Sequence, residues 1–258
     1  FYYYLLYVLS ARIASIVQLQ SKVEVHLDLT HGVNYQTVLT YRVVREVLET
    51  VSMLYRSDLC VYNSDPFVSG IESPINIHTV EKVSLVPRIP EGLTLTDRCL
   101  GTREKKRIDQ PCKGLSKKFR ELVSTSRNGN ETVNIYLLWA FLGAFFGGLP
   151  LATFEFYPDP DVVRAAADTC VDLFHEQTSV FRTDEVLTVT RKLDFRAGFR
   201  TLVLAALGAR LLKDRGLVER RESEVELSRL RALVDSCRLD ARFKALAKHE
   251  LNDFEGIV

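Results

Sequence analysis

The chain has 258 residues, of which 47% are hydrophobic and 26% charged, and its formal net charge is +1. This composition is ordinary for a globular protein, and the length is sufficient for two domains with packed cores. The small net charge excludes an overall electrostatic attraction to nucleic acid, so contact with RNA or phosphate must come from a local cluster. The five cysteines lack the paired spacing of a zinc site, so we expect no metal, and their scatter is typical of the cytoplasm.

The first 18 residues predict a buried helix whose aromatic side chains face the core. The chain begins at Phe1 rather than at methionine, and we expect the true N-terminal residues to be missing. Only two clear parallel strands follow, whereas a sheet usually has about five or six. We therefore expect a partial α/β domain, and no secretory signal pattern precedes it.

Residues 22–63 predict a strand, a helix and a second strand. Residues 23–29 alternate between apolar and polar side chains, with the period of two of a β-strand. Apolar residues then recur over residues 38–51 at the spacing of an amphipathic helix, and residues 59–62 form a second apolar run. A right-handed crossover makes the two strands parallel, so we expect the turns after both strands to lie at the same edge of the sheet.

Polar residues follow both predicted strands at that edge, which is where open α/β sheets bind their ligands. Gly32 permits the close approach of a ligand, and Asn34 lies where the helix offers unpaired N–H groups and the positive end of its dipole. The pattern favours the recognition of an anion or a nucleotide. Many turns of this kind only cap a helix, and that simpler interpretation stays open.

A strand predicted at residues 75–86 is followed by two prolines and a glycine, and we place a domain boundary near residue 90. Beyond this point the pattern becomes helical. Residues 133–149 are the most apolar segment, but they are shorter than the roughly 20 residues that a membrane span needs. We interpret them as the central buried helix of the second domain.

Two further helix starts are predicted in the second half. Asp159 and Pro160 suit the N-cap and the first position of a helix that runs to about residue 177. Ser223 and Glu226 have the spacing of a capping box at the start of a later helix.

Arg242 and His249 form the second chemical candidate. They are seven positions apart, so on a continuous helix they share a face with an axial separation of about 10 Å. A histidine moves a proton at neutral pH, and a guanidinium stabilises the charge that develops on phosphorus. RNA supplies its own 2'-hydroxyl nucleophile, so this chemistry requires no metal. The simpler interpretation is a solvated helix surface.

The run from His26 to Tyr35, His-Leu-Asp-Leu-Thr-His-Gly-Val-Asn-Tyr, resembles the Asp-x-Thr-His-Gly signature of the CRISPR-associated CARF-HEPN proteins of type III systems. Further stretches resemble the family in the same order, at residues 61–66, 75–78, 148–151 and 156–159. Arg242 and His249 resemble the HEPN motif, in which four to six residues separate an Arg from a His. The sequence departs from this motif at Phe243, where the family usually has a polar residue.

The resemblance implies the fold class α/β plus all-α, with a partial Rossmann-like CARF domain at residues 1–90 and a helical HEPN domain at residues 91–258. It implies an antiviral endoribonuclease that cleaves single-stranded RNA by 2'-hydroxyl attack, leaving a cyclic phosphate and using no cofactor. Cyclic tetra-adenylate or hexa-adenylate is the implied activator. The implied assembly is a homodimer or a larger oligomer, without a membrane.

The resemblance also assigns residues to both sites. The expected catalytic residues are Arg242 and His249. The expected ligands of the cyclic oligoadenylate are Asp28, Thr30, His31, Gly32, Asn34, Asn63 and Ser64.

Two functions of other classes stay open. A ligand-responsive regulator without catalysis would use residues 204–225 as part of a winged helix that binds DNA. A ring nuclease would instead degrade the cyclic messenger in the sensing domain.

Overall fold

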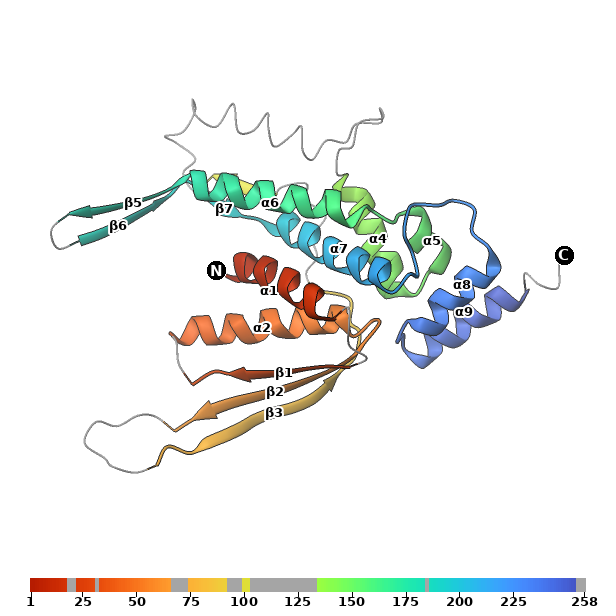
Figure 1. Ribbon diagram of the computed structural model, residues 1–258, viewed down its shortest axis with the longest axis horizontal. Helices are drawn as coiled ribbons and strands as arrows, with labels where there is room; N and C mark the ends of the chain where they lie inside the picture. The colour runs from red at the N-terminus through yellow and green to blue at the C-terminus, as the bar shows by residue number, and fades with distance from the viewer. Residues whose placement is uncertain are drawn as a thin grey trace.

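The computed structural model describes residues 1–17, 22–30, 33–65, 74–91, 99–102, 134–183 and 186–253. His31 and Gly32, two of the expected ligand-binding residues, lie outside these ranges. Figure 1 shows an α/β part, formed by the first elements of the chain, on one side of a group of helices formed by the later elements. The expected combination of a sheet and helices is present.

The α/β part consists of a three-stranded sheet and two helices. Its elements are α1 (Tyr2–Val17), β1 (Lys22–Asp28), α2 (Asn34–Val51), β2 (Arg56–Ser64) and β3 (Ile77–Leu85). The strand order is β1-β2-β3, with β1 parallel to β2 and β3 antiparallel to it. The predicted strand-helix-strand unit is therefore confirmed, and so is the strand predicted before the proposed boundary.

Helix α2 covers one face of this sheet (Figure 1). Val44 and Leu48 of α2 are buried in one cluster with Leu59 and Val61 of β2. Side chains of β1 alternate between exposed and half-buried, and the half-buried ones pack toward this cluster. The opposite face of the sheet carries the polar residues of β1.

The later part of the chain is mainly helical. Its helices are α4 (Ile135–Gly147), α5 (Pro150–Glu155), α6 (Pro160–Glu176), α7 (Ala197–Asp214), α8 (Leu227–Ser236) and α9 (Ala241–Asp253). Strand β4 (Leu100–Thr102) pairs with β7 (Leu193–Phe195), and β5 (Thr178–Thr183) forms a hairpin with β6 (Val186–Arg191).

The central helix of the molecule is α7, which corrects the expectation for the apolar segment at residues 133–149. Helix α7 lies in contact with α1, α2, α4 and α6, and most of its side chains are buried. Helix α4 lies beside it and buries fewer of its residues. Local apolarity pointed to α4, whereas position in the fold depends on neighbours from distant parts of the chain.

The two predicted helix starts have different outcomes. Asp159 accepts hydrogen bonds from the backbone N–H groups of Asp161 and Val162, so the N-cap of α6 is confirmed. The capping box at Ser223 was wrong. Helix α8 begins at Leu227 after Glu226, whose side chain makes no capping hydrogen bond.

The largest hydrophobic core crosses the predicted boundary near residue 90, which itself stays a prediction. Leu6 of α1 and Val47 of α2 are buried in the same cluster as Leu204 of α7. An ion pair joins the same helices, because Arg200 Nη2 of α7 lies 2.5 Å from Glu46 Oε1 of α2. Among the described residues, no helix is long and apolar enough to cross a membrane.

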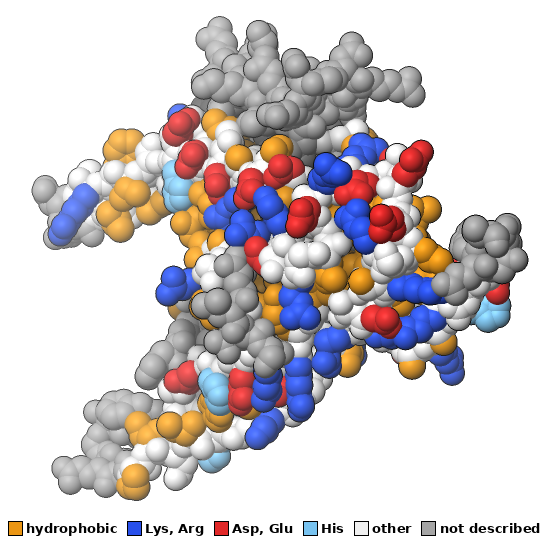
Figure 2. Space-filling view, turned by 45° about the vertical axis from the view of Figure 1, so that its right-hand side comes forward, with side chains coloured by type: hydrophobic (Ala, Val, Ile, Leu, Met, Phe, Trp, Pro, Cys, Tyr) orange, Lys and Arg blue, Asp and Glu red, His pale blue; other side chains and the backbone are white. Residues whose placement is uncertain are grey.

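The β5–β6 hairpin projects from the body of the molecule (Figure 1). Every residue of β6 is exposed, and hydrophobic side chains lie on the surface of the projection in Figure 2. Phe181 and Leu187 are 60% and 64% exposed. The hairpin therefore adds little to the core of this chain.

Candidate functional site

The first candidate site lies at the edge of the sheet where β1 and β2 end. Asp28 pairs in register with Tyr62, one residue before Asn63 and Ser64. The Leu29 N–H donates to the Tyr62 carbonyl at 2.9 Å and extends this pairing past the end of β1. The parallel register therefore brings the polar residues after both strands to one edge, as the sequence predicted.

Side-chain hydrogen bonds shape the turns at this edge. Asp28 Oδ1 accepts from the backbone N–H of Thr30 at 2.8 Å and from its hydroxyl group, which is the arrangement of an Asx turn. Asn63 Oδ1 accepts from the Ser64 N–H at 3.1 Å. The Ser64 hydroxyl donates to the Asp65 carbonyl at 3.1 Å. These contacts fix the turns while the Asp28 and Asn63 side chains stay exposed.

Asn34 begins α2 at the same end of the sheet (Figure 1). The residue before it, Val33, is the N-cap and provides no capping side chain. Both Val33 and Tyr35 are exposed. The first turn of α2 therefore presents backbone N–H groups and the positive end of the helix dipole at this edge.

Three residues that the sequence did not assign extend this edge. Asp65 follows β2 and accepts from Asn76 Nδ2 at 2.8 Å. His78 Nε2 lies 2.7 Å from Asp65 Oδ1. Hydrogen bonds from His78, and to a lesser degree from Asn76, hold the pKa of Asp65 below its usual value. The antiparallel register, which pairs His78 with Asn63, brings these residues to the site.

His26 was also expected to be an ordinary strand residue, but it makes a specific contact. Its ring stacks on the Tyr62 ring with a centroid separation of 5.8 Å, and its Nδ1 atom lies 3.0 Å from the Tyr62 hydroxyl. Both side chains lie next to the ends of β1 and β2. The edge thus combines aromatic, imidazole, amide and carboxylate groups.

The second candidate site lies on α9. Arg242 and His249 are both in this continuous helix, and both side chains are exposed. His249 Nδ1 lies 3.1 Å from Asp253 Oδ2, one turn further along the helix. The carboxylate favours the tautomer with a proton on Nδ1, which leaves Nε2 able to accept one. The sequence reasoning missed Asp253, although its i, i+4 spacing from His249 was visible.

Two large hydrophobic side chains share this part of α9. At 100° per residue, Leu246 lies between Arg242 and His249 on the helix surface, and Phe243 lies beside them. Phe243 is 56% exposed and Leu246 is 57% exposed. A helix normally turns such side chains toward a packed neighbour, so this face has the character of a contact surface.

The two candidate sites lie far apart along the molecule. Figure 1 places the ends of β1 and β2 at one end of the long axis and α9 at the other. Between them, Glu46 and Arg200 join α2 to α7 in a buried ion pair, and the Tyr2 hydroxyl donates to Glu46. Arg200 Nη1 also donates to the Glu91 carbonyl at 2.6 Å. A change at one site must therefore reach the other through the helices.

The described residues include no group of three or more His, Cys, Asp and Glu side chains placed to hold a metal ion. The segment at residues 204–225, considered for DNA binding, contains the buried end of α7 and the irregular connection to α8. Its helical part therefore does not offer an exposed recognition face.

Comparison with known proteins identifies the α/β part. Residues 1–66 match the family model described as the CARF domain of the CRISPR system endoribonuclease Csx1. The chain belongs to the CRISPR-associated CARF proteins. This match covers α1, β1, α2 and β2, including Asp28, Thr30, Asn34, Asn63 and Ser64 at the sheet edge.

A relative extends the similarity to most of the chain. The protein named CRISPR system endoribonuclease Csx1 from Methanocaldococcus jannaschii is 33% identical over 236 residues, which is 90% of this chain. The aligned part is 47% of that protein, so this chain spans about half the length of the curated relative. The family resemblance expected from the sequence is confirmed.

Proposed function

We propose that this CARF protein is part of a CRISPR-associated endoribonuclease that a cyclic oligoadenylate activates and that cleaves single-stranded RNA in the cytoplasm. The observation that carries the proposal is the alignment of 90% of the chain with a protein named as an endoribonuclease. The CARF match over residues 1–66 supports a ligand-binding role for the sheet edge.

The chemistry of the sheet edge suits an adenine nucleotide. Asp28 and Asn63 provide exposed carboxylate and amide groups that can pair with the amino group and ring nitrogens of adenine. The N-terminal turn of α2, beginning at Asn34, suits the phosphates. Thr30, His31, Gly32 and Ser64 complete the proposed binding residues, and a cyclic tetra-adenylate or hexa-adenylate would bind across two copies of this edge.

The proposed catalytic residues are Arg242 and His249 on α9. His249, held by Asp253 at 3.1 Å, takes the proton from the RNA 2'-hydroxyl through Nε2. Arg242 stabilises the charge on the phosphate, and the 2'-oxygen displaces the next nucleotide to leave a cyclic phosphate. Each step uses side chains of this protein and the RNA itself, without a metal.

A homodimer brings two such pairs together. One Arg242 and one His249 are about 10 Å apart along the helix axis, so residues from two copies reach one phosphate more readily. The exposed Phe243 and Leu246 lie on the same face and would be covered when two α9 helices meet. This explains an apolar residue after Arg242, where the HEPN motif usually has a polar one.

The test is the cleavage of a fluorescent single-stranded RNA in the presence of a chelator, with and without cyclic tetra-adenylate. We expect cleavage that requires the messenger and that falls at least 100-fold in His249→Ala, as for the loss of a general base. Lys248→Ala is the matched control, because Lys248 is the adjacent exposed residue and pairs with Asp235 at 2.6 Å instead.

Intact RNA at saturating messenger would contradict the proposal. If the messenger itself disappeared while the RNA stayed intact, a ring nuclease would replace it. Duplex DNA binding that survives His249→Ala, without RNA cleavage, would favour the regulator.

A further inference from the structure

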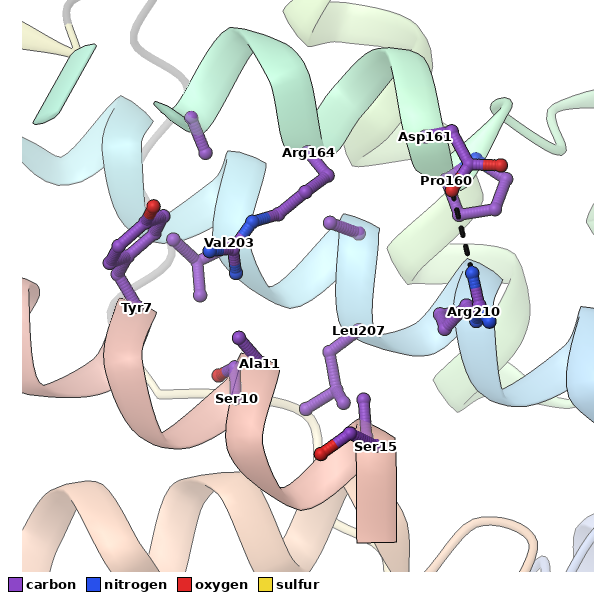
Figure 3. Close-up of a pocket in the computed structure, with 13 residues that line it drawn as sticks. Tyr7, Ser10, Ala11, Ser15, Pro160, Asp161, Arg164, Val203, Leu207 and Arg210 are labelled. Carbon is purple, nitrogen blue, oxygen red and sulfur yellow. Dashed lines mark hydrogen bonds and ion pairs between the residues drawn. The ribbon is translucent and has the colours of Figure 1, made fainter. Parts of the chain in front are cut away.

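A cavity of about 340 Å³ lies between α1, α6 and α7. Figure 3 shows side chains from all three helices converging on it, and none of them belongs to the sheet edge or to α9. Its volume is in the range of small-molecule sites, which measure roughly 300 to 1,000 Å³. The cavity therefore has room for a ligand that neither proposed site accommodates.

The walls of the cavity are apolar and formed mainly by small side chains. Ala11 and Ala14 of α1 line one side, and Ala167 of α6 with Val203 and Leu207 of α7 line the other. Small residues on facing helices leave a narrow space between the backbones. Such a space favours a flat molecule with apolar faces.

The charged groups at the rim are already paired with one another. Arg164 lies 4.0 Å from the centre of the Tyr7 ring, and its Nε atom is 2.7 Å from Asp168. Arg210 Nη1 lies 3.4 Å from Asp161, as the dashed line in Figure 3 shows. A charged ligand would have to break these pairs or enter without a counter-ion, which is costly in an apolar cavity. The occupant is therefore uncharged.

One polar group in the wall is unsatisfied. Ser10 of α1 is 4% exposed, and its hydroxyl has no hydrogen-bond partner among the described residues. An unpaired buried hydroxyl costs about 1 to 3 kcal/mol. Ser15, on the same helix and in the same cavity wall, already donates to the Arg12 carbonyl at 2.7 Å. Ser10 is thus the group that a ligand would complete.

We propose that this cavity binds a small uncharged heterocycle whose N–H or O–H group pairs with the Ser10 hydroxyl. The ligand would lie between α1 of the CARF part and α6 and α7 of the helical part. It would therefore bind independently of the messenger edge and of Arg242 and His249.

Indole and indene are a matched pair of probes, because they have nearly the same shape and only indole carries an N–H group. Dissociation constants for the full chain are measured by ligand-observed NMR titration. We expect indole to bind about fivefold more tightly than indene, the value of one hydrogen bond. Ser10→Ala should reduce indole affinity to that of indene, and Ser15→Ala should leave it unchanged.

Absence of indole binding at millimolar concentration would overturn the proposal, as would equal binding of indole and indene to the unmodified chain. Equal effects of Ser10→Ala and Ser15→Ala would also overturn it. The comparison of the two probes on the unmodified chain requires no variant, so it stands even if a substitution impairs folding.

Discussion

At the scale of single residues, the contact between His249 and Asp253 carries the proposed chemistry. Asp253→Asn removes the carboxylate that favours a proton on Nδ1, so Nε2 is less often free to act as a base. We expect RNA cleavage to fall about tenfold, the value of a hydrogen bond to a charged group, while messenger affinity is unchanged. Single-turnover cleavage and messenger titration measure the two effects.

Glu250→Gln is the control for Asp253→Asn, because it makes the same carboxylate-to-amide change at an exposed position of α9. Its cleavage rate should equal that of the unmodified chain. Equal rates for Asp253→Asn and the unmodified chain would remove Asp253 from the mechanism.

The pair of Asp65 and His78 predicts a pH effect at the sheet edge. The pKa of Asp65 is lowered on folding, so the pair adds stability above the unfolded pKa of about 4 and loses it as the pH falls through the lowered value. NMR titration of the carboxyl carbon should show that His78→Ala raises the pKa of Asp65 toward its ordinary value. Asn76→Ala should raise it less, because Asn76 contributes less to the shift.

An unchanged Asp65 pKa in His78→Ala would contradict this account. The sequence could not reveal the pair, because Asp65 and His78 meet only through the antiparallel register of β2 and β3. By contrast, Asp28, Thr30, Asn63 and Ser64 were predicted at one edge, since the parallel pairing of a strand-helix-strand unit follows from its local pattern.

At the scale of elements, two glycines with positive φ end α4 and follow α7. Gly148 has φ +68° and a Cβ there would lie 2.6 Å from the Leu239 side chain, whereas Gly216 has φ +63° and open space around it. We expect Gly216→Ala to cost about 1 kcal/mol of unfolding free energy, from backbone strain alone. Gly148→Ala should cost more, because Leu239 must also move, and urea denaturation would measure both.

Equal costs for the two substitutions would contradict the predicted contact with Leu239. The order of helices along the chain was largely predictable, because amphipathic spacing and the Asp159 cap are local signals. The central position of α7 was not, because it depends on α1, α2, α4 and α6 packing around it. Local apolarity ranks segments by composition and does not identify their neighbours.

At the scale of the whole molecule, the proposed sensor edge and α9 lie at opposite ends (Figure 1). The shared core and the ion pair between Glu46 and Arg200 connect the α/β part to α7. Burial raises the pKa of Glu46, and Arg200 opposes this shift. No local pattern predicts such a link, because its two residues are far apart in the sequence.

Coupling requires that the messenger bind the active arrangement more tightly than the inactive one. A substitution at the edge should then change the messenger concentration that is needed and leave the chemistry intact. Asn63 is suited to this test, because it is exposed and lies far from Arg242 and His249.

The most direct test of the account is the RNA cleavage rate as cyclic tetra-adenylate is titrated, for the unmodified chain and for Asn63→Ala. The account predicts messenger-dependent cleavage, with a half-activating concentration about tenfold higher in Asn63→Ala for the loss of one or two hydrogen bonds. The maximal rate should be the same in both. Cleavage without messenger, or identical activation curves for the two proteins, would contradict it.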